Sequence, residues 1–144
     1  MKMNNGLLVR IFLMASLWPL SSQASDPVEV EVFLEMRSCP GCDLSGAFLD
    51  TVAAIGGDLG DANLRDASLY RMNLDQANLS GADMTGVNLK WANLNGADLS
   101  NATLYNADLT YATLVNAKTT LLLTDGTTTC PDGTSGPCNF QEGN

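Results

Sequence analysis

The sequence predicts an all-β solenoid, a rod of short repeated units, on two observations. Residues 42–116 of the 144-residue chain divide into consecutive units of five residues with no break in register. One place in each unit is apolar, and Leu fills it in every unit except those with Ala54 and Met84. Such self-similarity at a fixed short period is the signature of a repeat architecture. The series comprises Leu44, Leu49, Leu59, Leu64, Leu69, Leu74, Leu79, Leu89, Leu94, Leu99, Leu104, Leu109 and Leu114.

The second observation is a small side chain two residues before each of these places. It is Ala in most units, and the exceptions are Cys42, Val52, Gly57, Met72 and Val87. A short polar residue, most often Asn or Asp, separates the small residue from the Leu. Such a residue suits a turn, because its side chain can bond nearby backbone groups.

A period of five matches neither a helix face, which recurs every 3.6 residues, nor a strand face, which recurs every two. A period of five gives a regular structure if the chain turns a corner after each unit. Every Leu can then point to one axis, and the small residue can point inward beside the corner. The predicted rod therefore has its apolar core along its own axis.

Units such as Ala62-Asn63-Leu64-Arg65-Asp66 and Ala97-Asp98-Leu99-Ser100-Asn101 resemble those of the pentapeptide repeat proteins. The resemblance covers about half of the chain. It implies a right-handed quadrilateral β-helix with four units per coil, in which residues 20 apart stack at about 4.8 Å. Residues 42–116 would then make about four coils and a rod roughly 18 Å long.

Residues 1–24 have the pattern of a secretory signal peptide. Lys2 and Arg10 form a basic start, residues 11–20 are apolar, and Ser22-Gln23-Ala24 supplies small residues for cleavage. The apolar run is shorter than the roughly 20 residues that span a bilayer. We therefore expect export to a periplasm, a thylakoid lumen or the medium, with no stable membrane anchor after cleavage. An uncleaved N-terminal anchor is the alternative.

Residues 25–41 precede the repeats and are expected to cap the N-terminal end of the rod. Asp26-Pro27-Val28-Glu29 is a good helix start, with a cap, Pro at the first helical position and a following acid. We therefore expect a short capping helix. The same stretch also alternates apolar and acidic residues, so a strand is the alternative for residues 27–37. Either would cover the open end of a solenoid.

Two other stretches depart from the repeat. Residues 52–58 contain paired glycines, which favour a bulge or loosened loop on the first coil. Residues 117–144 are expected to form a C-terminal cap and tail, with residues 121–123, three consecutive Leu, folded over the open end as an apolar plug. The tail from Cys138 to Asn144 is expected to fray.

The four cysteines are Cys39, Cys42, Cys130 and Cys138, and an even count behind an export signal favours disulfides. In the β-helix that the resemblance implies, the stacked coils separate the first two from the last two by more than a disulfide can span. That fold favours the pairs Cys39–Cys42 and Cys130–Cys138. Thiol exchange through the C-x-x-C motif and metal binding are the alternatives. The segment from Cys39 also resembles the start of the first coil in secreted members of the family, which favours a structural bridge.

The chain has no His, no Gly-x-Ser-x-Gly motif and no phosphate-binding glycine loop. Most carboxylates repeat at the turn position, which indicates a structural use. We therefore expect no enzyme activity, no cofactor and no metal. The net charge of −9 disfavours binding to nucleic acid or to anionic lipid.

One side of the predicted rod gathers aromatic and basic residues at outward positions. With residues 20 apart stacked, Arg71, Trp91 and Tyr111 share a column, and Tyr70 and Lys90 share the next. Trp, Tyr and Arg are enriched at interface hot spots, although the pattern favours a cation–π and aromatic ladder that stabilises the stack. The candidate interaction face is Phe48, Tyr70, Arg71, Lys90, Trp91 and Tyr111.

The leading hypothesis is an exported, non-enzymatic structural and protein-interaction module, monomeric or weakly self-associating, with an unidentified protein partner. The alternative is a DNA mimic of the kind found among cytoplasmic family members that bind gyrase, which the acidic charge and rod shape would suit. The export signal, a central series of Leu where those members often use Phe, and the lack of a clear C-terminal dimerisation helix oppose it. A thiol-exchange protein acting through Cys39 and Cys42 is a third, minor hypothesis.

Overall fold

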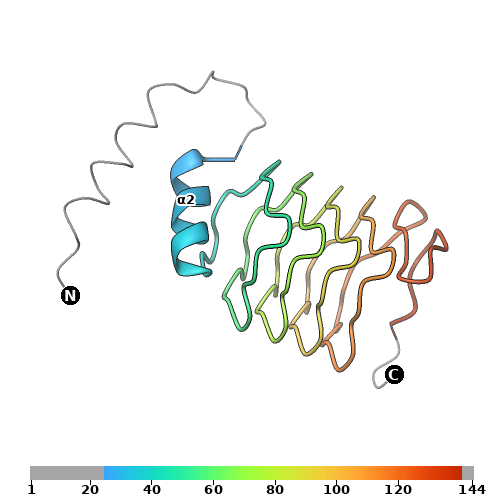
Figure 1. The fold of residues 1–144 in the computed structure, drawn as a ribbon. Coiled ribbons are helices and arrows are strands. Elements are labelled where there is room, and N and C mark those ends of the chain that lie inside the picture. The colour runs from blue at the N-terminus through green and yellow to red at the C-terminus, as the bar shows by residue number, and fades with distance from the viewer. Residues whose placement is uncertain (1–24, 141–144) are drawn as a thin grey trace, which may run out of the picture.

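The structure, a computed structural model, describes residues 25–140 and contains one helix followed by a stack of coils (Figure 1). The helix, α2, spans Pro27–Met36. The segment expected to be a signal peptide lies outside the described residues. No helix within residues 25–140 combines the length and the apolar character needed to cross a membrane.

Parallel β-bridges join each coil to the next, and they define four sides. The four ladders start at Asp43, Phe48, Ala53 and Asp58, and each continues to the residue 20 positions later, as in Asp43↔Asn63. Each side contributes a single bridge per coil, so the ladder residues do not extend into longer strands. This is the four-units-per-coil register that the resemblance implied.

The corners between sides are tight turns closed by backbone hydrogen bonds. The N–H of the small residue donates to the carbonyl of the central apolar residue three positions earlier, as from Met72 to Leu69 at 3.0 Å. The residue just before the small one lies in the left-handed region, as Asp61 does at φ 56° and Gly81 at φ 70°. A turn with positive φ at its third position favours Gly or Asn there.

The core follows the rod axis. The central Leu residues from Leu44 to Leu109 are fully buried, and the Ala residues two positions earlier are almost as well buried. The intervening Asn or Asp side chain accepts a hydrogen bond from the N–H two residues later, as Asp98 does from Ser100 at 3.0 Å. Three successive residues of the repeat therefore have three roles. The small residue allows close approach beside the corner, the Asn or Asp caps the turn, and the Leu fills the core.

Helix α2 lies across the N-terminal end of the stack (Figure 1). The Asp26 carboxylate accepts from the N–H of Val28 at 2.8 Å, and Pro27 opens the helix. Phe33 is fully buried against the core of the first coil. The N–H of Asp43 donates to the Glu29 carboxylate, which ties the helix to the coil. Of the two forms that the sequence allows, the structure has the helix.

The expectation of a bulge in residues 52–58 is wrong. Ala53 bridges Asn73 and Asp58 bridges Asn78, so the register continues through this stretch. Gly57 occupies a small-residue position, and a Cβ there would collide with the carbonyl oxygen of Arg37. The glycine makes room for the end of α2, which explains the departure from the consensus.

The expectation of a plug formed by residues 121–123 is also wrong, because the coil continues beyond residue 116. Leu123 bridges Thr103, which places it on an outward position, and Leu121 stands at a left-handed corner with 72% of its surface exposed. Only Leu122 packs against the core. The ladder then reaches Thr129, opposite Asp108, with one extra residue inserted before it. Phe140, in the segment expected to fray, packs against the core.

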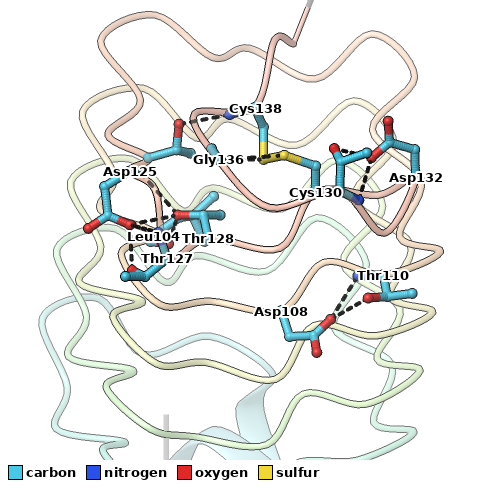
Figure 2. The surroundings of a disulfide bond; sticks show 12 residues. Leu104, Asp108, Thr110, Asp125, Thr127, Thr128, Cys130, Asp132, Gly136 and Cys138 are labelled. Atoms are coloured by element: carbon cyan, nitrogen blue, oxygen red, sulfur yellow. Dashed lines mark hydrogen bonds between the residues drawn. A yellow bond between two sulfur atoms is a disulfide. The ribbon is translucent and has the colours of Figure 1, made fainter.

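Two disulfides lie at opposite ends of the stack. Cys39 pairs with Cys42, with Cα atoms 5.6 Å apart, and Cys130 pairs with Cys138, with Cα atoms 5.5 Å apart. Figure 2 shows the second pair above the last complete coil. Beside it the Thr128 hydroxyl donates to the carbonyl of Leu104 at 2.8 Å, which anchors the C-terminal loop to the coil.

Candidate interaction surface

Arg71, Trp91 and Tyr111 occupy the same corner on three successive coils. The N–H of Arg71 donates to the carbonyl of Lys90 at 2.9 Å, and the N–H of Trp91 donates to the carbonyl of Thr110 at 3.0 Å. These bonds hold the coils in the register that stacks the three side chains. We call Tyr70, Arg71, Trp91 and Tyr111 the aromatic column.

The side chains of the aromatic column contact one another along the rod axis. The ring centroids of Trp91 and Tyr111 are 4.4 Å apart, with the ring planes inclined at 33°. The Arg71 guanidinium lies over two rings, 5.3 Å from the centroid of Tyr70 and 6.0 Å from that of Trp91. Trp91 nevertheless keeps 50% of its surface exposed and Tyr111 keeps 59%.

The backbone of this column is unusual for such large residues. Arg71, Trp91 and Tyr111 have φ of 56°, 61° and 62°. For residues other than Gly, and to a lesser degree Asn and Asp, the left-handed region costs roughly 1–2 kcal/mol per residue. Thr51, Gln76 and Leu121 lie in the same left-handed region, whereas many other corners use the favoured residue types, including Gly81, Gly86, Gly96, Asn101, Asn106 and Asn116. The column therefore accepts strain that the chain avoids at those corners.

The remaining two residues of the predicted face are placed differently. Lys90 pairs with Asp108, with Nζ and Oδ2 2.9 Å apart, beside the column. Phe48 lies on the first coil, on a ladder position opposite Ser68, and 86% of its surface is exposed. Phe48 therefore belongs to a flat side of the rod, whereas the aromatic column stands at a corner.

A groove near the C-terminal end was not foreseen from the sequence. It encloses about 330 Å³ and is lined by residues 112–115 together with Pro131, Asn139 and Phe140. It forms because the chain folds back after the second disulfide and brings Phe140 beside Val115. The pairing of Cys130 with Cys138 is the one sequence signal for such a return.

Carboxylates on the rod serve its turns and ion pairs. Hydrogen bonds from Ser100 hold the pKa of Asp98 below its usual value, and Lys118 acts in the same direction. Burial raises the pKa of Asp108, but hydrogen bonds from Thr110 and Lys90 outweigh it, so the net direction is downward. Within residues 25–140, no three His, Cys, Asp or Glu side chains gather as a metal ion would require.

Taken together, the four-sided coil, its axial Leu core and its polar turn residues define a β-helical repeat protein. The family of pentapeptide repeats matches residues 56–90 and 82–118, in eight copies. The chain is a pentapeptide repeat protein, and its repeat region folds as the right-handed quadrilateral β-helix of that family. This fold is a protein-interaction module.

Several solved pentapeptide repeat proteins are similar to the chain. HetL, involved in heterocyst differentiation regulation in the cyanobacterium Nostoc, is 30% identical over 68% of this chain and 51% of its own, with a TM-score of 0.42. A protein from the Arabidopsis thaliana thylakoid lumen is 33% identical over 60% of this chain and 63% of its own, with a TM-score of 0.34.

A second Nostoc protein is 27% identical over 84% of this chain and 92% of its own, with a TM-score of 0.43. In the comparison with HetL, the present chain spans about half of the length of that protein. A comparison with curated proteins finds no match.

Proposed function

We propose that this chain is an exported, non-enzymatic protein-interaction module and that the aromatic column is its partner-binding surface. The observation that carries the proposal is the strained and half-exposed placement of Trp91 and Tyr111. Residues held in unfavourable backbone regions cluster at functional sites, where the surrounding structure over-determines them. Trp, Tyr and Arg are also the residues enriched at binding hot spots.

A purely stabilising ladder accounts less well for the column. An aromatic pair contributes about 0.5–1.5 kcal/mol beyond its buried area. An exposed cation–π contact contributes about 0.5–1 kcal/mol. Three bulky residues at left-handed corners cost roughly 1–2 kcal/mol each. The contacts of Arg71, Trp91 and Tyr111 therefore at most balance their backbone strain and add little net stability, so binding is the better reason to keep them.

Export is the second part of the proposal. Residues 1–24 have the charge and apolar pattern of a signal peptide. Two disulfides in a chain of this size fit an oxidising compartment. The proposed organisation is a signal peptide in residues 1–24, an N-terminal cap in 25–41, the repeats in 42–116, and a C-terminal cap and tail in 117–144. The last boundary marks the end of the repeated sequence, since the coil itself runs on to Thr129.

The binding part is tested by comparative capture from the exported fraction of the source cells. The bait is the mature chain, and its matched variants are Trp91→Asn and Tyr105→Thr. Asn occupies equivalent corners at positions 101, 106 and 116, and Thr85 precedes Tyr105 in its own column, so both variants keep the local backbone. We expect a protein retained by the wild type and by Tyr105→Thr but lost with Trp91→Asn. Equal retention by all three would refute the role of the column.

The export part is tested by the intact mass of the native protein in exported and cytoplasmic fractions. The proposal expects an exported species without residues 1–24 and lighter by four hydrogens than the reduced chain. A full-length cytoplasmic species with four free thiols would overturn it. That result would favour the DNA-mimic alternative instead.

A further inference from the structure

The aromatic column and the C-terminal groove form one continuous surface. Tyr111 is the last member of the column and directly precedes Ala112, the first residue of the groove. The N–H of Tyr111 donates to the carbonyl of Pro131 at 2.9 Å, and Pro131 lines the groove as well. A segment lying on Trp91 and Tyr111 would therefore reach the groove without crossing another side of the rod.

The two ends of this surface differ in chemistry. Among residues 25–140 the ion pairs are Arg65–Asp83, Lys90–Asp108 and Lys118–Asp98, and Arg71 takes part in none of them. Its guanidinium lies over two aromatic rings, and within residues 25–140 it donates no side-chain hydrogen bond. The guanidinium fork matches a carboxylate in two parallel hydrogen bonds.

The other end is apolar. Leu114, Val115 and Phe140 line the groove, and Val115 is 45% exposed. An aliphatic or aromatic side chain that enters such a groove removes its own apolar surface from water, together with that of these residues.

We propose that this surface binds an extended segment of a partner protein, which runs along the rod axis with a carboxylate on Arg71 and a large apolar side chain in the groove. This inference rests on the proposed function and adds the chemistry and direction of the partner. Two coil steps of about 4.8 Å separate Arg71 from Tyr111 at the edge of the groove, and a third reaches Pro131 inside it, or about 14 Å in all. An extended chain covers that distance in about four residues at roughly 3.3 Å each.

The net charge of the chain limits how many acidic residues the partner segment can carry. A net charge of −9 repels strongly acidic segments, so a run of carboxylates would be disfavoured on approach. Arg71 is a local positive charge that can still attract one carboxylate. The expected segment therefore carries a single acidic residue, followed or preceded at about four positions by Leu, Ile, Phe or Met.

A phage-displayed library of random dodecapeptides, selected on the mature chain, tests the inference directly. The variants are Arg71→Gln, Val115→Asn and, as a matched loss of an arginine elsewhere, Arg65→Gln. Gln76 stands at an equivalent corner with φ 58°, and Asn95 stacks on position 115, so the first two variants suit their backbones. Synthetic copies of the enriched peptides would be measured by fluorescence anisotropy.

We expect enriched peptides to share one acidic and one large apolar residue about four positions apart. Arg71→Gln should weaken their binding about tenfold or more, as the loss of a charged hydrogen bond implies. Val115→Asn should weaken it severalfold, and Arg65→Gln should leave it unchanged. Exchanging the acidic residue of the peptide for its amide should match the effect of Arg71→Gln.

Other outcomes overturn the inference in distinguishable ways. Peptides that need Trp91 but carry no acidic residue, or are indifferent to Arg71→Gln, would leave the proposed function standing and refute the partner chemistry. A selection that yields no peptide sensitive to Trp91→Asn would refute both. A wild-type dimer in sedimentation that becomes monomeric in Trp91→Asn would identify a second copy as the occupant and refute the inference.

Discussion

The carbonyl oxygen of Arg37, which ends helix α2, lies where a side chain on Gly57 of the first coil would have to stand. The repeat consensus at position 57 is Ala, yet the fold requires Gly there. Gly57→Ala should therefore destabilise the protein by about 2 kcal/mol or more, because the obstacle is backbone and overpacking of this kind forces it to move. Urea unfolding monitored by circular dichroism would measure the loss.

The same consensus logic supplies the control for Gly57→Ala. Val87 also replaces Ala at a small-residue position, but no helix lies against it in the middle of the stack. Val87→Ala should cost roughly 1.5–2.5 kcal/mol, as the removal of two buried carbons does, and here the cause is lost burial rather than overpacking. If Gly57→Ala were as stable as the wild type, the account of how α2 seats on the first coil would be wrong.

Phe140 packs on the core only two residues after Cys138, so the second disulfide should hold it in place. Replacing Cys130 and Cys138 together by Ala should cost about 2.5 kcal/mol from the loop closed over a sequence separation of 8. Phe140→Ala should be destabilising in the wild type but nearly neutral in that background, because the side chain would already be detached. A double-mutant cycle in urea measures this coupling, and additive effects would show that Phe140 packs independently.

Asp98 should make stability depend on acid. Hydrogen bonds from Ser100, assisted by Lys118, lower the pKa of Asp98 in the folded state. A lowered folded pKa stabilises the protein above the unfolded value, near 3.8, and this contribution disappears as the pH falls through the folded pKa. Asp83 and Asp108 also have lowered pKa values, so stability should fall below about pH 4. It should stay nearly flat from pH 5 to 8, because the chain has no His.

Asp98→Asn isolates one part of this acid dependence. Asn78, one coil earlier in the same column, accepts from the N–H of Ser80 at 3.1 Å, so Asn preserves the turn cap. The variant should lose less than about 1 kcal/mol at pH 7, since the Lys118 pair is exposed. It should match the wild type at pH 2. An equal deficit at both pH values would show that the carboxylate charge does not stabilise the fold.

The short period predicted the core, and the resemblance to the pentapeptide repeat family implied the four-unit coil that sets the register and the column. Taking residues 20 apart as neighbours is enough to place Arg71, Trp91 and Tyr111 in one column. The left-handed strain at those corners could not be foreseen, because the period places residues in columns but does not supply their φ angles.

The C-terminal end escaped prediction for a different reason. Thr128 and Cys130 take the small and central places of the last side, and one inserted residue shifts the pattern, so the repeat stops being visible while the backbone pairing continues. The groove depends on the return of Phe140 across that side, which is a tertiary contact with no periodic signature.

The central claim is that Trp91 and Tyr111 serve binding rather than stability, and the thermal stability of Trp91→Asn tests it most directly. Asn relieves the left-handed strain at position 91 while removing the contacts to Tyr111 and Arg71. Our account predicts a free energy of unfolding within about 1 kcal/mol of the wild type, because the lost contacts and the relieved strain are of similar size. A loss of about 3 kcal/mol or more would show that the column is a structural ladder and would contradict the account.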